Sequence, residues 1–81
     1  MNSVANNQEA EAVLKELGIP PNKVTEPLIA AAQRALDRLG SRANTVIWFR
    51  KYNPLLGSSP IEQVRKGQLA KLNQYIDQLP T

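Results

Sequence analysis

The sequence contains no cysteine and no histidine among its 81 residues. Without cysteine, neither disulfides nor thiol chemistry is available, and this absence is compatible with a reducing cytoplasm. Without histidine, the chain lacks the commonest zinc ligand and the usual general base at neutral pH. The carboxylates show no spacing that would pair two of them in one site. We therefore expect neither an enzyme nor a bound metal or cofactor.

Long apolar runs are also missing from the chain. No stretch approaches the roughly 20 apolar residues that cross a bilayer, and the polar, acidic first twelve residues lack the basic start of a signal peptide. These features predict a soluble, cytoplasmic protein that does not bind membranes. A chain this short makes one domain, and it buries only about 60–65% of its unfolded surface, so its stability margin should be small.

Aromatic residues are scarce: the chain has one Trp, one Phe and two Tyr. Three of them, Trp48, Phe49 and Tyr52, lie within five residues of one another. Burying a large apolar side chain supplies a major share of the stability of a small domain, so we expect Trp48 to anchor the core. Trp48→Ala should then cost about 3–5 kcal/mol through cavity formation.

Apolar residues recur at helical spacing over five segments, at about 7–17, 26–39, 42–52, 60–66 and 68–78. Thr25, Ser41 and Ser59 are placed to cap three of these helices, and Glu62 would complete a capping box with Ser59. The sequence thus predicts an all-α fold: a compact single-domain bundle of about five short helices over residues 7–81, after a flexible N-terminus at 1–6. The residues expected to face the core are Ala10, Val13, Leu14, Leu17, Leu28, Ala31, Ala32, Ala35, Leu36, Leu39, Ala43, Val46, Ile47, Trp48, Phe49, Tyr52, Leu55, Leu56, Ile61, Val64, Leu69, Leu72, Ile76 and Leu79.

Positive charge is concentrated in the middle of the chain. Residues 34–71 carry eight basic groups against two carboxylates, a balance of +6, whereas residues 1–33 carry two lysines against four glutamates, a balance of −2. A basic segment favours an acidic partner surface or nucleic acid, or else is a solvated helix face. A helix-turn-helix around Gly67 fits poorly, because the helix before it is short and the helix after it carries only Lys71.

Helix-stop, turn and helix-start signals follow the aromatic cluster in the sequence. Asn53-Pro54 ends a helix. Leu56-Gly57 then makes a turn that anchors a leucine in the core. Ser59-Pro60-Ile61-Glu62 starts the next helix, which Gly67 ends. With Trp48, these residues resemble the C-terminal toxin-binding domain of Xre/MbcA/ParS-type antitoxins over about residues 36–79. The N-terminal DNA-binding region of that family is not recognisable in residues 1–35.

The resemblance implies binding to a partner protein, and related antitoxins neutralise RES-type toxins that act on NAD. Our leading hypothesis is therefore a non-catalytic, antitoxin-like module that neutralises a bacterial or phage toxin of this type by direct binding. The alternatives are a small basic nucleic-acid-binding regulator, and a phage- or plasmid-encoded modulator of a host protein. A homodimer is a further alternative. The expected partner-binding residues are Arg50, Lys51, Asn53, Arg65 and Lys66, with the tail from Tyr75 to Thr81 as a segment that inserts into the partner.

Overall fold

The computed structural model describes the backbone of residues 2–79 and the side chains of residues 8–79. The elements in chain order are α1 (Asn2–Glu16), a 3-10 turn η1 (Pro21–Lys23), α2 (Glu26–Leu39), α3 (Arg42–Arg50), α4 (Pro60–Arg65) and α5 (Leu69–Asp77). Residues 2–79 contain five α-helices and no β-strand, so the predicted all-α class is confirmed.

Two helix boundaries differ from the prediction by more than one residue. Helix α1 begins at Asn2 instead of at about residue 7, so the backbone of residues 2–6 is helical. Met1 and the side chains of residues 1–7 lie outside the described residues, and the predicted flexibility of this segment stays a prediction. Helix α3 ends at Arg50 instead of at about Tyr52, because Lys51 already adopts an extended backbone.

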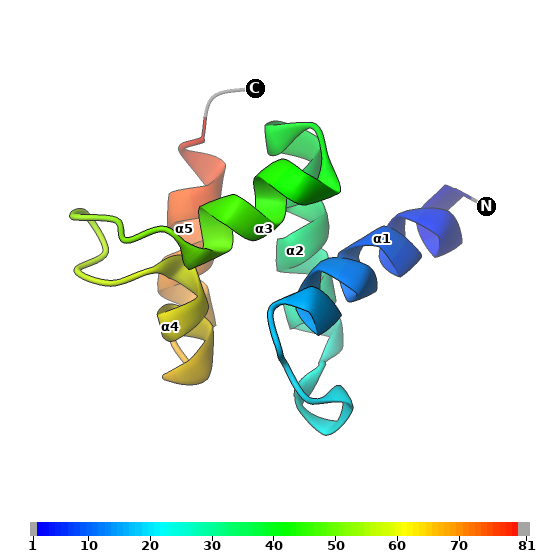
Figure 1. The fold of residues 1–81 in the computed structure, drawn as a ribbon, viewed down its shortest axis with the longest axis horizontal. Helices are drawn as coiled ribbons and strands as arrows, with labels where there is room; N and C mark the ends of the chain where they lie inside the picture. Colours follow the sequence, from blue (N-terminus) through cyan, green and yellow to red (C-terminus); the bar gives the residue numbers. More distant parts are fainter. Residues whose placement is uncertain (1, 80–81) are drawn as a thin grey trace.

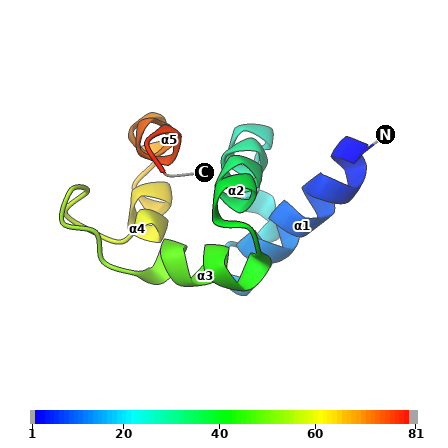
Figure 2. The same ribbon diagram turned by 90° about the horizontal axis from the view of Figure 1, so that it is seen from above.

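Helix α3 joins the two halves of the molecule, which are the α1–α2 pair and the α4–α5 pair. It runs along one side of the bundle, with α1 and α2 against its first part and α4 at its far end (Figures 1 and 2). Helix α5 returns beside α4 and also packs on α2. The long loop between α3 and α4 extends away from the bundle on the side of α4 and α5.

The α1–α2 pair is built as its apolar pattern predicts. Three alanines of α2, at positions 31, 32 and 35, are fully or almost fully buried and let α1 approach closely. The four apolar residues expected on the inner face of α1 are all buried. Thr25 Oγ1 accepts a hydrogen bond from the Leu28 N–H (3.4 Å) at the start of α2, so the predicted cap is confirmed.

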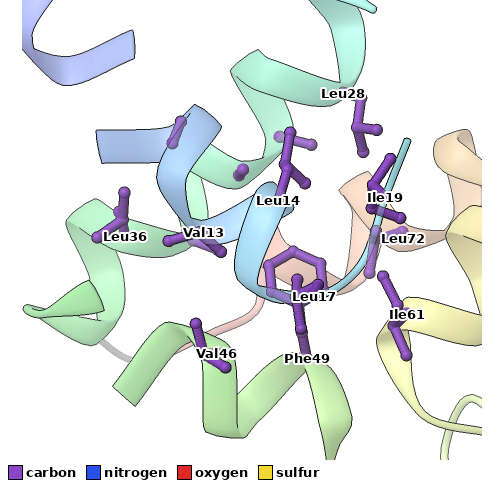
Figure 3. Close-up of a cluster of buried hydrophobic side chains, with 14 of the residues drawn as sticks. Val13, Leu14, Leu17, Ile19, Leu28, Leu36, Val46, Phe49, Ile61 and Leu72 are labelled. Atoms are coloured by element: carbon purple, nitrogen blue, oxygen red, sulfur yellow. The ribbon is translucent and has the colours of Figure 1, made fainter. Parts of the chain in front are cut away.

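Phe49, and not Trp48, is the aromatic residue at the centre of the core. Phe49 is completely buried and lies among Leu17 just after α1, Ile61 of α4 and Leu72 of α5 (Figure 3). Trp48 is only partly buried and packs against the edge of this cluster. The expectation that Trp48 anchors the core was therefore wrong, since the two adjacent residues lie about 100° apart around the helix and only one can point inward.

The predicted inner face of α3 was also wrong in part. The buried residues are Thr45, Val46 and Phe49, whereas Ala43 is exposed and Ile47 is 63% exposed. The apolar pattern misleads here because the polar Thr45 belongs to the core. Its Oγ1 hydroxyl donates to the Ser41 carbonyl oxygen (2.7 Å), which removes the cost of burying it. Ser41 also caps α3 as predicted, accepting from the Asn44 N–H (3.1 Å).

Polar side chains, not apolar packing alone, hold α5 against α2. Arg34 Nη1 donates to Asn73 Oδ1 (2.7 Å), and the same guanidinium forms an ion pair with Asp77. Arg38 Nη1 donates to the Leu79 carbonyl oxygen (2.8 Å), just beyond the end of α5. Two of the basic groups in the middle of the chain therefore have a structural role.

Candidate partner-binding surface

Asn53 organises the loop between α3 and α4. Its side-chain Oδ1 accepts from the Leu55 N–H (2.9 Å), which forms the local turn that asparagine favours. Its backbone carbonyl accepts from the N–H groups of Leu56 (3.1 Å) and Gly57 (2.9 Å), and its own N–H donates to the Ser58 carbonyl (3.0 Å). This one residue thus fixes the path of the next five.

The two adjacent leucines of this turn point in opposite directions. Leu56 is 7% exposed and packs inward as predicted, whereas Leu55 is 76% exposed. Two consecutive side chains in a tight turn cannot both reach the core, so the expectation for Leu55 was wrong. Gly57 closes the turn with φ +72°, a conformation that costs glycine little.

A buried glutamine attaches the loop to α4. Gln63 is 3% exposed, and its Nε2 donates to Ser58 Oγ (2.8 Å) and, more weakly, to the Leu56 carbonyl (3.4 Å). Pro60 occupies the first turn of α4 as predicted and is buried. Gly67, with φ +74°, ends this helix, and the next N–H, of Gln68, donates back to the Gln63 carbonyl (2.9 Å).

The expected capping box at the start of α4 does not form. Ser59 stands at the N-cap with an extended backbone, but its side chain makes no capping hydrogen bond. Glu62 instead accepts from Arg65 (2.8 Å) within the same helix. Since Pro60 has no N–H and Gln63 already holds the loop, helix α4 begins without this cap.

Asn53 also connects the loop to α5 through the Tyr75 side chain. The Asn53 Nδ2 group donates to the Tyr75 hydroxyl oxygen. The Tyr75 ring lies nearly parallel to the Trp48 indole, with an interplanar angle of 17° and ring centroids 6.4 Å apart. Trp48 in turn meets Phe49 edge to face at 4.9 Å. An unbroken set of contacts therefore runs from the core to this part of the surface.

A hollow of about 380 Å³ opens where these elements meet. Its apolar lining, which we call the tryptophan patch, consists of Trp48, Tyr52, Pro54, Leu55 and Tyr75. Lys51 and Asn53 complete the lining. Tyr52 is 64% exposed, contrary to its expected place in the core.

The outermost members of the tryptophan patch, Tyr52 and Leu55, are mostly exposed to solvent. Single exposed hydrophobic residues are common, but several large ones around one hollow mark an interaction site. Within residues 8–79 the large hydrophobic side chains that are strongly exposed are Ile47, Tyr52 and Leu55. Two of the three line this hollow, and Ile47 lies on α3 beside Trp48 in the sequence.

The structure separates the five residues expected to bind a partner. Lys51 and Asn53 line the hollow, although the Asn53 side chain is occupied by Leu55 and Tyr75. Arg50 turns toward α1, where its Nη2 donates to the Glu16 carbonyl oxygen (2.7 Å). Arg65 pairs with Glu62, and Lys66 caps the C-terminal end of α4, the end that leads away from α3 (Figure 1).

The basic middle segment is therefore not one continuous basic surface. All five arginine side chains of the chain bind described residues, whereas no lysine side chain has a hydrogen bond or ion pair with them. Four of the guanidiniums connect one helix with another helix or helix end, whereas that of Arg65 pairs within α4. The lysines among residues 34–71, whose side chains have no such contact within the described part, are Lys51, Lys66 and Lys71.

Sequence reasoning missed two residues of this surface and did not foresee the position of a third. Tyr52 and Leu55 were placed in the core, and Tyr75 was taken only as the start of a tail, of which residues 80–81 lie outside the described residues. The signal that could have found Leu55 is its place beside Leu56 in a turn. For Tyr75, the sequence pattern gives no such signal, since its neighbours Trp48 and Asn53 come from distant positions.

Within residues 2–79, no group of three or more acidic side chains is placed to hold a metal ion, and none of the helices has the length and hydropathy to span a bilayer. Comparisons of the chain with protein-family models, with curated proteins and with solved structures find no match.

Proposed function

We propose that this chain is a non-catalytic protein-binding module and that the tryptophan patch is its docking surface. The observation that carries the proposal is the exposure of Tyr52 and Leu55 around one hollow, next to the half-buried Trp48. Trp and Tyr are the residue types that dominate binding hot spots in protein interfaces. A partner side chain seated in this hollow would bury apolar surface that the isolated chain leaves in water.

The rigidity of the surface supports the same function. The loop that carries Pro54 and Leu55 is fixed by Asn53 and held on α4 by Gln63, so its shape exists before any partner arrives. Binding to a preformed surface avoids much of the entropy loss of ordering a loop. The residues that make this turn are the same ones that resemble the antitoxin family.

The finer proposal follows from that resemblance. We take the partner to be a RES-type toxin, which the chain neutralises by covering part of its surface. Any chemistry on NAD then belongs to the partner. A host protein bound by a phage- or plasmid-encoded modulator would use the same patch, so the identity of the partner separates these alternatives.

Co-expression tests the proposal. The chain is produced together with a RES-type toxin encoded beside its own gene, and both growth rescue and co-purification are measured. We expect rescue by the parent chain and loss of rescue and co-purification for Tyr52→Ala combined with Leu55→Ala. Ile47→Ala, which truncates an equally exposed residue outside the hollow, is the matched control and should still rescue. Full rescue by the double variant would contradict the proposal.

A second candidate is binding to single-stranded nucleic acid. Aromatic faces beside a basic group, as with Tyr52 and Lys51, are the arrangement that stacks bases and contacts phosphates. This function predicts binding to an oligonucleotide that falls steeply with salt. If no binding is measured at about 50 mM salt, where phosphate contacts are strongest, this candidate is eliminated.

A further inference from the structure

The charged residues of α3 and the following loop are all of one sign. Residues 38–61, which span α3 and the loop, contain no aspartate or glutamate and carry Arg38, Arg42, Arg50 and Lys51. Two of these arginines lie on the flank of α3 that faces α1: Arg42 is 3.7 Å from the Glu16 carboxylate, and Arg50 donates to the Glu16 backbone. Lys51 is the charged residue that lines the hollow.

Helix α5 adds a second lysine and keeps its carboxylate away. Lys71 is exposed and lies one turn before Tyr75, so the two side chains share a face of the helix. Asp77, two residues after Tyr75, lies on the opposite flank, where it pairs with Arg34 of α2. Lys51, directly after the end of α3, and Lys71, one helical turn before Tyr75 on α5, therefore contribute positive charge at the patch.

Two further acidic groups, on α1 and α4, are paired with arginines. Glu16 pairs with Arg42 and Glu62 pairs with Arg65. The other acidic residues of the described part lie on α1 and α2, at positions 9, 11, 26 and 37. An acidic segment of a partner would consequently meet two lysines and no carboxylate at the patch, whereas a basic segment would meet like charge.

We propose that the segment that occupies the tryptophan patch is an acidic protein segment, in which one aliphatic or proline side chain enters the hollow and flanking carboxylates approach Lys51 and Lys71. This inference rests on the proposed function and specifies the chemistry of its partner. The aliphatic Leu55, at the most exposed part of the lining, favours a protein side chain over a nucleic-acid base. Two lysines also supply few phosphate contacts for a polyanion.

The test uses the full chain and two short synthetic peptides without tryptophan. One places Pro-Leu between runs of Asp and Glu, and the other places the same Pro-Leu between runs of Lys. Binding is followed through the fluorescence of Trp48, the one tryptophan of the chain. We expect the acidic peptide to bind, and its affinity to fall at least about tenfold between about 50 mM and about 300 mM salt.

Charge-reversal variants locate the contact. Lys51→Glu combined with Lys71→Glu should weaken the acidic peptide at least about tenfold, because attraction becomes repulsion. Lys23→Glu combined with Lys66→Glu makes the same change of net charge away from the patch and should leave binding within about twofold. All four side chains are exposed, so the fold should persist, which circular dichroism checks.

Three results would overturn the inference: no binding of the acidic peptide, equal binding of the basic peptide, or binding of a single-stranded oligonucleotide in place of the acidic peptide. Equal loss in both charge-reversal pairs would also overturn it, since the effect would then come from net charge alone. If the lysine variants still bind the toxin but the Tyr52→Ala, Leu55→Ala variant does not, the docking surface stands and only its partner chemistry is wrong.

Discussion

The inward and outward faces of α3 show how one short helix serves two purposes. Inward, Thr45, Val46 and Phe49 are buried and join both halves of the bundle. Outward, Ile47 is exposed, and Trp48 lies on the border between the two faces. The same division continues in the loop, where Leu56 is buried and Leu55 is not. Of two adjacent residues with nearly equal hydrophobicity, one is thus buried and stabilises the fold, and the other stays exposed and available to a partner.

The strongest test of this division is truncation of the central aromatic residue. Phe49→Ala should lower the free energy of unfolding by about 3–5 kcal/mol, because it leaves a cavity among α1, α3, α4 and α5. For a domain of this size that is most of the stability, so the variant should be largely unfolded in thermal or urea denaturation. A stable Phe49→Ala variant would contradict the inward role of this face.

The two leucines of the loop offer a matched comparison. Leu56→Ala should lower the free energy of unfolding by about 2–4 kcal/mol, because it empties a buried position. Leu55→Ala, the same chemical change one residue earlier, should alter it by less than about 0.5 kcal/mol. Urea denaturation of both variants measures the difference. Equal losses of stability would contradict the description of one leucine as buried and the other as exposed.

Trp48 lies between these extremes. Trp48→Ala should cost about 2 kcal/mol, roughly half the cost of removing a fully buried aromatic side chain, because part of the indole already faces the hollow. Some of this cost is the lost stacking on Tyr75. Thermal denaturation should show a folded variant with a lower midpoint. If Trp48→Ala lowers the free energy of unfolding as much as Phe49→Ala does, Trp48 is a core residue after all.

The two serines before α3 and α4 give the smallest expected effects. Ser41→Ala should lower the free energy of unfolding by about 1 kcal/mol, because it removes a cap on the Asn44 N–H. Ser59→Ala should change it by less than about 0.5 kcal/mol, since this side chain makes no capping bond. A shift of about 1 kcal/mol moves the melting temperature of a small domain by roughly 4–8 °C, which calorimetry resolves.

How far the sequence predicts this structure depends on what positions each element. Helices α1 and α2 follow their apolar spacing, and Thr25 and Ser41 cap as expected, because these signals are local. Helix α3 does not follow its apolar spacing, because Thr45 is buried and its hydroxyl donates to the Ser41 carbonyl oxygen. The patch depends on contacts between distant positions, such as Asn53 with Tyr75, which no local spacing encodes.

One measurement tests the central claim that the tryptophan patch, which includes Trp48 at the border of the two faces of α3, is the surface for a partner. The single tryptophan is replaced by fluorotryptophan, so that fluorine NMR reports Trp48 alone in the presence of the toxin. We predict a resonance whose shift differs between H₂O and D₂O in the free chain and loses that difference in the complex, because the partner covers the indole. A solvent effect that is the same in the free and bound chain would contradict the claim.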